Sequence, residues 1–249
     1  ELLIFIDSIR KANAKDINVI IPYYGYSRQD RIARPREPIS ARLVADLLLT
    51  VGVSHVITLD LHTPQIQGFF SCPVDNLSSI HLFASYYLNK LRQLKIDPSE
   101  VVIVSPDHGS AHRGRDLATA LPKSQLAIVD KRRPSPNEAE VVNIVGDVEG
   151  KTCIIIDDII DTGGTIIASA KELYAKGAKN ILVAASHGVF SKNSATDLKE
   201  VGISDIVTTD SIEKAIEGVN VISIAEVISH VITHNESGTS LPPEYLAFY

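Results

Sequence analysis

The sequence is poor in several features, and each shortage excludes a class of protein. Among its 249 residues there is no Met and no Trp, and the two Cys, Cys72 and Cys153, lie far apart without a Cys-x-x-Cys spacing. Two isolated cysteines exclude a disulfide scaffold and a zinc site built on cysteine pairs. No apolar run approaches the roughly 20 residues that a membrane-spanning helix needs. We therefore expect no membrane insertion and a reducing, cytoplasmic location.

What remains is the composition of a soluble globular protein, with 45% apolar and 22% charged residues in a length that suits one large or two small domains. The net charge of −6 argues against a nucleic-acid partner, although a local basic patch can still bind phosphate. The opening Glu-Leu-Leu-Ile-Phe-Ile-Asp reads as amphipathic helix and not as a signal peptide. Because even an initiator Met is missing, we expect that Glu1 is not the biological start.

Short β-branched runs alternate with helical patterns along the chain, which predicts an α/β fold of mainly parallel sheets flanked by helices. The expected strands are Asn18–Ile21, His55–Leu59, Val101–Val104, Leu126–Val129, Cys153–Ile156, Ile181–Ala184, Ile206–Thr208 and Val221–Ile224. The expected helices are Leu2–Ala14, Ser40–Thr50, Ser79–Leu94, Gly164–Lys176 and Ala225–Thr233. A domain boundary is expected near Asp75–Ser79, and the two strands before it are too few for a stable sheet.

Charged and polar side chains follow five of these strands, at the point where each is expected to end. Arg28, His62, Asp107, Lys131 and Asp157 each come soon after a different expected strand. Open α/β sheets bind ligands just beyond the carboxyl ends of their strands. The pattern therefore predicts a binding site at this edge.

The most informative segment reads Asp-Asp-Ile-Ile-Asp-Thr-Gly-Gly-Thr and leads from a buried strand into a helix. Its polar and glycine residues are Asp157, Asp158, Asp161, Thr162, Gly163, Gly164 and Thr165. The glycines allow a tight turn whose N–H groups converge, and the helix dipole and the threonine hydroxyls favour a phosphate monoester. The two leading acids suit the vicinal hydroxyls of a sugar, directly or through a metal. The alternative interpretation is an acidic turn with Thr165 as a helix N-cap.

Three further segments carry groups suited to a nucleotide and to phosphoryl transfer. Arg28 and Gln29 lie in an arginine-rich loop, and Arg binds phosphate bidentately and stacks on adenine. His62 is a candidate metal or phosphate ligand, and Asp107 is a hard oxygen ligand suited to Mg²⁺. Lys131 begins a Lys-Arg-Arg-Pro segment that reads as a cationic lid over the site. Considered singly, each segment is also compatible with an exposed loop.

The acidic and glycine-rich segment closely resembles the phosphoribosyl-diphosphate loop of the type I phosphoribosyltransferase fold. Further stretches, in order along almost the whole chain, resemble the ribose-phosphate pyrophosphokinase family. They are Pro-Tyr-Tyr-Gly-Tyr-Ser-Arg-Gln-Asp-Arg, Arg-Glu-Pro-Ile-Ser-Ala, Asp-Leu-His-x-x-Gln-Ile-Gln-Gly-Phe-Phe, Val-Ser-Pro-Asp and Asp-Lys-Arg-Arg-Pro. The resemblance implies transfer of a diphosphoryl group from ATP to the 1-hydroxyl of ribose 5-phosphate, with AMP leaving and Mg²⁺ as the cofactor.

The resemblance also implies a role for each matching residue. Arg28 and Gln29 fall on ATP contacts, and His62 and Asp107 on the magnesium–nucleotide positions. Lys131 and Arg133 match the catalytic flexible loop, with Arg133 also reaching the ribose phosphate. The ribose 5-phosphate site takes the remaining matches: Asp157, Asp161, Thr162, Gly163, Gly164 and Thr165. The sequence departs from the family pattern at Ser110, where a second Gly is usual, and we expect crowding there.

At the level of the whole chain, the resemblance implies two phosphoribosyltransferase-like domains. Residues 1–77 would be the remainder of an N-terminal domain truncated at its start, and residues 78–249 the domain that carries the ribose 5-phosphate loop. A homo-oligomer, a hexamer built from dimers, is the implied assembly. Two alternatives stay open: a phosphoribosyltransferase, which shares the phosphate loop, and a non-catalytic regulatory subunit of the same family.

Overall fold

The computed structural model describes residues 1–132 and 141–247, without the side chains of residues 131, 132, 141, 142 and 244. It divides into two compact units, in which unit 1 is Glu1–Ser78 with Val227–Tyr249 and unit 2 is Ser79–Glu226. From the sequence we expected residues 78–249 to form one domain. In the structure the final segment, Val227–Tyr249, groups with unit 1 instead. It does so because Leu246 forms an antiparallel bridge with Leu77, and the amide of Ala247 donates to Asn76 O at 2.8 Å.

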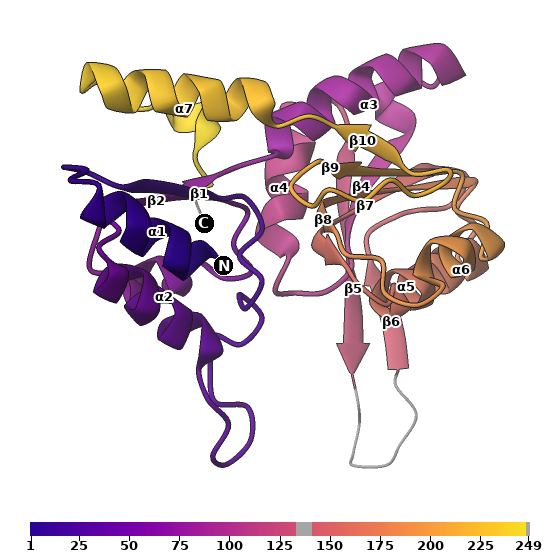
Figure 1. Cartoon of the computed structure of the whole chain (residues 1–249). Helices are drawn as coiled ribbons and strands as arrows, with labels where there is room; N and C mark the ends of the chain where they lie inside the picture. The colour runs from indigo at the N-terminus through magenta and orange to yellow at the C-terminus, as the bar shows by residue number, and fades with distance from the viewer. Residues whose placement is uncertain (133–140, 248–249) are drawn as a thin grey trace. The chain divides into compact units, whose positions relative to one another are not determined.

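Unit 1 is built on a three-stranded parallel sheet in the order β1-β2-β3. Figure 1 shows α1 and α2 on one face of this sheet and α7 on the other. Its elements are α1 (Leu2–Lys11), β1 (Asn18–Ile21), α2 (Ser40–Val51), β2 (His55–Leu59), η1 (Pro64–Phe69), β3 (Val74–Leu77), α7 (Ala225–Ser237) and η3 (Pro243–Tyr245). β3 was not expected from the sequence, and it gives the sheet the third strand that an isolated pair lacks.

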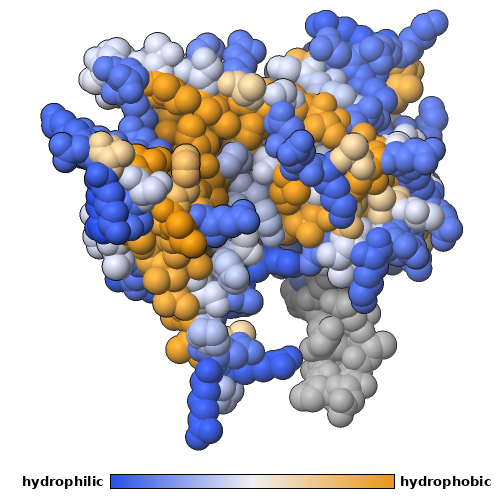
Figure 2. Space-filling view, viewed as in Figure 1, coloured by the Kyte–Doolittle hydropathy of each residue, from blue (hydrophilic) through white to orange (hydrophobic). Residues whose placement is uncertain are grey.

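The core of unit 1 lies between its sheet and the two helices α1 and α2. Ile6 of α1 and Leu48 of α2 are both 1% exposed and pack with Val56 of β2. The outer side of α1 is also apolar, since Ile4 is 77% and Phe5 64% exposed. Figure 2 shows this hydrophobic surface over α1 and α2. A contiguous exposed apolar surface of this kind is typical of an interaction site.

Unit 2 contains a seven-stranded sheet in the order β10-β9-β8-β7-β4-β5-β6, parallel except for the β5–β6 pair. Its strands are β4 (Val101–Ser105), β5 (Gln125–Arg132), β6 (Val141–Val145), β7 (Thr152–Ile160), β8 (Asn180–Gly188), β9 (Asp205–Thr209) and β10 (Asn220–Ile222). Its helices are α3 (Ile80–Leu94), η2 (Pro98–Glu100), α4 (Ala111–Ala120), α5 (Gly164–Ala175) and α6 (Ser194–Glu200).

Both faces of this sheet are covered, which explains why its central strands are apolar at nearly every position. Ile103 and Ile154 face a core formed with α3 and α4. Val104 and Ile155 face a second core, formed with α5 and α6. The sheet is therefore the middle layer of three, and its strand ends form an edge where loops from both faces meet.

The fold class predicted from the sequence is confirmed, with differences in detail. All eight expected strands and all five expected helices are present, and β3, β6, α4 and α6 are additional. β7 runs to Ile160, four residues beyond its expected end at Ile156. Asp157 and Asp158 therefore lie within the strand and not in the turn that follows it. The strand continues because β8 pairs with it as far as Gly188.

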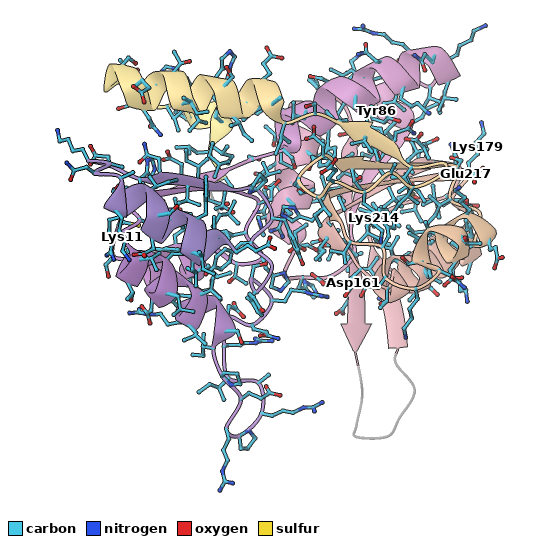
Figure 3. All side chains as sticks on the ribbon, in the orientation of Figure 1. Lys11, Tyr86, Asp161, Lys179, Lys214 and Glu217 are labelled. Carbon is cyan, nitrogen blue, oxygen red and sulfur yellow. The ribbon has the colours of Figure 1, made fainter. Side chains whose placement is uncertain are left out.

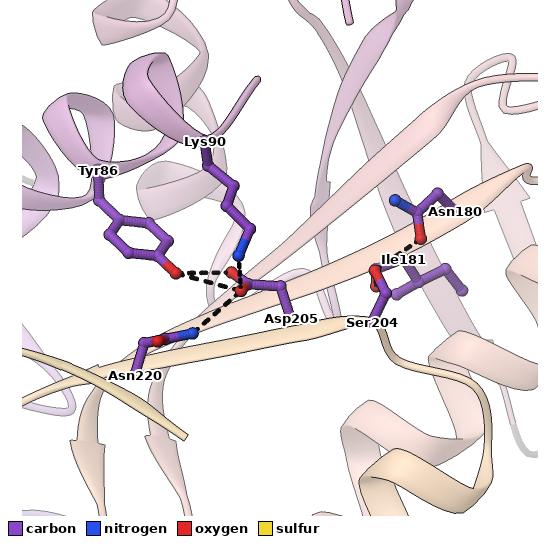
Figure 4. A network of polar contacts seen from close by, with 7 residues as sticks. All are labelled: Tyr86, Lys90, Asn180, Ile181, Ser204, Asp205 and Asn220. Carbon is purple, nitrogen blue, oxygen red and sulfur yellow. Dashed lines mark hydrogen bonds and ion pairs between the residues drawn. The ribbon is translucent and has the colours of Figure 1, made fainter. Parts of the chain in front are cut away.

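A buried polar network joins α3 to the amino ends of β9 and β10 (Figure 4). The Asp205 carboxylate accepts hydrogen bonds from Tyr86 Oη at 3.0 Å and from Asn220 Nδ2 at 3.0 Å, and it pairs with Lys90 Nζ at 2.6 Å. The Asp205 side chain is 2% exposed, whereas that of Lys90 is 27% exposed. Burial and the neighbouring Asp205 charge raise the pKa of the Tyr86 hydroxyl, so Tyr86 acts as a neutral donor. The network satisfies a carboxylate that would otherwise be costly to bury.

We expect Asp205→Ala to lower the free energy of unfolding by about 3 kcal/mol, because it removes the shared acceptor of three donors. Urea unfolding followed by circular dichroism measures the change. Glu213→Ala, at an exposed acid of the same unit, is the control and should stay within about 0.5 kcal/mol of the unaltered chain. A loss below about 1 kcal/mol for Asp205→Ala would contradict a stabilising role for the network.

Candidate active site

The carboxyl edge of the unit 2 sheet holds most of the residues singled out in the sequence. β4 pairs with β7 on one side and with β5 on the other, all in parallel, so their carboxyl ends lie side by side. The chain leaves β4 through α4 on one face and leaves β7 through α5 on the other. Open α/β sheets usually bind ligands at such a reversal, beyond the carboxyl ends of two neighbouring strands. Asp107 follows β4 and Asp161 follows β7, so both lie at this position.

The predicted phosphate loop has a backbone conformation that favours glycine at Gly163. Gly163 is the N-cap of α5 with φ 75°, a left-handed conformation that favours glycine. A Cβ at this position would also lie 3.4 Å from Leu198 Cγ of α6. Gly163 is buried, whereas Thr162, Gly164 and Thr165 are exposed. Thr162 and the first two residues of α5 are therefore exposed beside the N-terminus of the helix, where an anion is favoured.

Two adjacent acids in β7 lie close to this loop. The amide of Asp158 donates to Asp157 Oδ1 at 2.9 Å, and Asp158 is only 4% exposed. Burial raises the pKa of Asp157 well above its usual value, and the charge of Asp158 and a hydrogen bond with its side chain raise it further. The Asp157 carboxyl therefore takes up a proton more readily than an exposed acid does, and as a pair the two side chains can both donate to and accept from hydroxyl groups.

Two further charged side chains, Arg113 and Asp107, affect the pKa of Asp157. The guanidinium of Arg113 lowers the pKa of Asp157, and the carboxylate of Asp107 raises it. Arg113 lies in α4 and is 5% exposed. From the sequence, the role of Arg113 stays ambiguous, because a His-rich helix start is more often solvated than catalytic. The structure makes it a buried positive charge beside the acidic pair.

The Asp107 loop is held by serine hydroxyls. Asp107 Oδ1 accepts from the amide of Ser110 at 2.8 Å and from Ser110 Oγ at 2.9 Å, and Ser110 Oγ lies 2.8 Å from Ser105 Oγ. Ser105 Oγ in turn donates to Asp107 O at 2.7 Å. Ser110 is 4% exposed, so the hydroxyl that replaces the usual glycine is packed beneath the loop and fixes the Asp107 carboxylate.

A second contact connects this loop to the end of β5. His108 Nε2 lies 3.1 Å from Asp130 Oδ1, and Asp130 is 9% exposed. Asp130 immediately precedes Lys131, which is still part of β5. The side chain of Lys131 lies outside the described part of the structure, as does Arg133 altogether. The candidate catalytic cations therefore stay predictions, although the strand that leads to them ends at the same edge as Asp107.

The remaining predicted residues lie in unit 1, at the carboxyl end of its own sheet. Arg28 and Gln29 are exposed and His62 is half-buried. The two segments are connected through Asp30, whose Oδ2 accepts from Thr63 Oγ1 at 2.6 Å and from Gln65 Nε2 at 3.2 Å. Asp30 thus connects the Arg28–Gln29 loop to the chain that follows His62.

A metal site is the one prediction without a complete set of protein ligands. Among the described residues, no group of three or more His, Cys, Asp or Glu side chains is placed to hold a metal ion. Asp107 belongs to unit 2 and His62 to unit 1. Mg²⁺ in nucleotide enzymes is commonly held by one or two carboxylates with substrate phosphates and water. A single oriented carboxylate at Asp107 fits that mode of binding.

A mainly parallel sheet with an acidic pair and a glycine-rich phosphate loop at its carboxyl edge defines a domain of the phosphoribosyltransferase type. Comparison with protein families agrees, since residues 75–223 match the phosphoribosyl transferase domain. Residues 1–52 match the N-terminal domain of ribose phosphate pyrophosphokinase. The described helices include none long and apolar enough to cross a membrane.

Curated and solved relatives narrow the assignment. The chain is 50% identical over 236 residues to a ribose-phosphate pyrophosphokinase of Staphylococcus saprophyticus, covering 93% of this chain and 72% of that protein. It is 49% identical over 247 residues to the one of Halalkalibacterium halodurans, covering 97% and 76%. A crystal structure of phosphoribosylpyrophosphate synthetase from Mycobacterium smegmatis matches with a TM-score of 0.85 and 40% identity, over 95% of this chain and 76% of that one. The chain belongs to the ribose-phosphate pyrophosphokinase family.

We expect Asp157→Asn to stabilise the protein increasingly as the pH rises. The pKa of Asp157 is raised above its ordinary value of 3.8 in the folded chain, so its ionisation at higher pH destabilises the fold relative to the unfolded chain. The amide removes that cost. Urea unfolding should give no difference near pH 4 and a gain of about 1–2 kcal/mol near pH 8.

Asp197→Asn, at an exposed acid in α6, is the matched control. It should show no such rise with pH, because this side chain is exposed to solvent and lies outside the acidic pair of β7. An equal response of the two variants would mean that Asp157 does not carry the buried charge.

Proposed function

We propose that this chain is a ribose-phosphate diphosphokinase. It transfers the β,γ-diphosphoryl group of ATP to the 1-hydroxyl of ribose 5-phosphate, giving phosphoribosyl diphosphate and AMP for nucleotide biosynthesis. The observation that carries the proposal is the exposed phosphate loop at the start of α5, directly after the two acids of β7. The activity named in its relatives, which are about 50% identical, supports the same reaction.

Ribose 5-phosphate binds along the end of β7. The 5-phosphate accepts hydrogen bonds from the backbone N–H groups of the loop and from the hydroxyls of Thr162 and Thr165. Asp161 carries the loop's leading carboxylate. The ribose hydroxyls reach Asp157 and Asp158, and the raised pKa of Asp157 allows its carboxyl to donate while that of Asp158 accepts.

ATP binding is assigned to Arg28, Gln29 and His62. Arg28 and Gln29 contact the nucleotide, with a planar guanidinium able to stack on adenine and to bind phosphate. His62 in unit 1 is assigned to the nucleotide phosphates. Asp107 in unit 2, oriented by Ser110, would hold Mg²⁺ as an oxygen ligand. The metal would neutralise phosphate charge during the transfer.

The reaction needs no nucleophilic side chain. The 1-hydroxyl of the ribose attacks the β-phosphorus in line with the departing AMP, and catalysis consists of positioning and charge neutralisation. Lys131 and Arg133 supply cations for the negative charge that builds up on the transferring group. Arg133 also contacts the ribose phosphate.

Neither alternative accounts for the whole chain. A phosphoribosyltransferase has no use for the ATP segment around Arg28, and residues 1–52 match a domain of the synthetase. A purely regulatory subunit has no need of a complete phosphate loop. We also propose a cytoplasmic homo-oligomer, a hexamer built from dimers, and the exposed apolar side chains Ile4 and Phe5 support contacts between copies.

Product analysis tests the reaction directly. The protein is mixed with ATP, ribose 5-phosphate and Mg²⁺, and AMP and phosphoribosyl diphosphate are measured. Equal amounts of both products are expected, and their formation should stop when Mg²⁺ is chelated. Pyrophosphate release from phosphoribosyl diphosphate in the presence of a free base, without AMP formation, would instead support the transferase.

We expect Lys131→Ala to lower kcat by about 100- to 1000-fold while the KM values change less than about threefold, because the cation acts mainly on the transition state. Steady-state kinetics with each substrate varied in turn measures the split. Lys179→Ala, at an exposed lysine next to the amino end of β8, is the control and should leave kcat unchanged. A large rise in KM at unchanged kcat would assign Lys131 to substrate binding instead.

A further inference from the structure

Lys214 makes a contact that the proposed mechanism does not use. It lies in the connection between β9 and β10, and its ammonium donates to Val189 O at 2.7 Å and to Phe190 O at 2.9 Å. Both carbonyls belong to the turn that follows β8. The Lys214 ammonium thus binds two consecutive carbonyl oxygens that lie outside the helices and strands of unit 2.

That turn is itself bonded to the start of the phosphate loop. The amides of Val189 and Phe190 donate to Ile160 O at 2.9 and 3.0 Å, and the amide of Ser191 donates to Asp161 O at 3.0 Å. Ile160 is the last residue of β7, and Asp161 is the first residue of the loop. Each of the three turn residues therefore contributes a hydrogen bond that sets where the loop begins.

The turn has a backbone that needs outside support. Phe190 has φ 46° and Lys192 has φ 58°, both in the left-handed region that residues with a side chain enter at a cost. The Phe190 ring is buried against Gly188, where a Cβ would lie 2.6 Å from Phe190 Cε2. An ammonium that binds the carbonyls of this turn stabilises a conformation that the residues alone disfavour.

The connection that carries Lys214 is anchored near both of its ends, so the ammonium is held at a defined place. Ser211 Oγ donates to Ser186 O at 3.1 Å and lies 2.8 Å from His187 Nδ1 of β8. Near the other end, Lys199 Nζ of α6 donates to Glu217 O. Lys214 reaches from this anchored segment toward the turn, and Figure 3 labels it together with Asp161.

We propose that Lys214 is a positioning residue for ribose 5-phosphate, a role that rests on the proposed function of the loop. Its ammonium fixes the Val189–Ser191 turn, and the turn fixes the carbonyls of Ile160 and Asp161. The loop amides are thereby directed at the phosphate before it binds. Lys214 itself touches neither substrate nor reacting atoms, so its loss acts on affinity and leaves the chemical step intact.

Calorimetry on the full chain compares Lys214→Gln with Lys214→Arg. The Kd of ribose 5-phosphate should rise about five- to tenfold in Lys214→Gln, because two charge-assisted hydrogen bonds are lost. Lys214→Arg keeps a cation that donates to both carbonyls, and it should restore binding to within about twofold. The Kd of ATP and the kcat at saturating ribose 5-phosphate should change less than about twofold in either variant.

Lys199→Gln is the matched control. It removes the other lysine bound to the same connection, but that lysine does not contact the turn, so the Kd of ribose 5-phosphate should stay within about twofold. Equal weakening by Lys199→Gln and Lys214→Gln would overturn the proposal in favour of general loosening of the connection. Wild-type affinity in Lys214→Gln would overturn it as well.

Hydrogen exchange separates this proposal from the proposed function. In the ligand-free protein, the amides of residues 161–165 should exchange about fivefold faster in Lys214→Gln than in Lys199→Gln, whatever the loop binds. Unchanged exchange would refute the positioning role. If the unaltered chain fails to bind ribose 5-phosphate while the exchange result holds, the proposed substrate is wrong and the mechanical role of Lys214 stands.

Discussion

The parallel pairing of β4 with β7 is the constraint on which the rest of unit 2 depends. Its register sets Val101 beside Thr152, so the two strands end at the same edge of the sheet. The helices that leave these strands cover opposite faces of the sheet, and open α/β sheets usually bind ligands at such a position. The acidic residues, the Asp107 loop and the phosphate loop can therefore face one ligand. Loss of this pairing would separate them, however well each loop folds by itself.

The same edge concentrates charge in a poorly hydrated place. Asp107, Asp157 and Asp158 repel one another there, and Arg113 is the buried counter-charge that offsets part of the repulsion. A binding site for a sugar phosphate and a metal-bound nucleotide needs such groups held in place before the ligands arrive, and this lowers stability. At the opposite edge, Asp205 is also buried, but its three donors leave no charge unmatched. The two edges therefore serve different purposes, one binding and one stability.

Local sequence patterns predicted most of the helices and strands, and there is a physical reason for each element that they missed. β3 reads Val-Asp-Asn-Leu, which has too few apolar residues to resemble a strand, and it forms because β2 pairs with it. α4 begins Ala-His-Arg-Gly-Arg-Asp, a polar run interrupted by Gly114. That glycine lets the helix approach the sheet, since a Cβ there would lie 3.0 Å from Leu126 Cδ1. In both cases the partner that stabilises the element is distant in sequence.

The sequence by itself determined the α/β class, the phosphate loop and the family, because these depend on short ordered motifs whose backbone requirements are local. Gly163 is the clearest case, since a left-handed residue before a helix favours glycine wherever the chain goes next. Only the tertiary structure decided that Arg113 neutralises Asp157, that Ser110 orients Asp107 and that Lys214 supports the turn beside Asp161. Each of these contacts joins segments that meet through strand pairing and helix packing. Sequence spacing does not predict these contacts, because the segments that make them come together only when the strands pair and the helices pack.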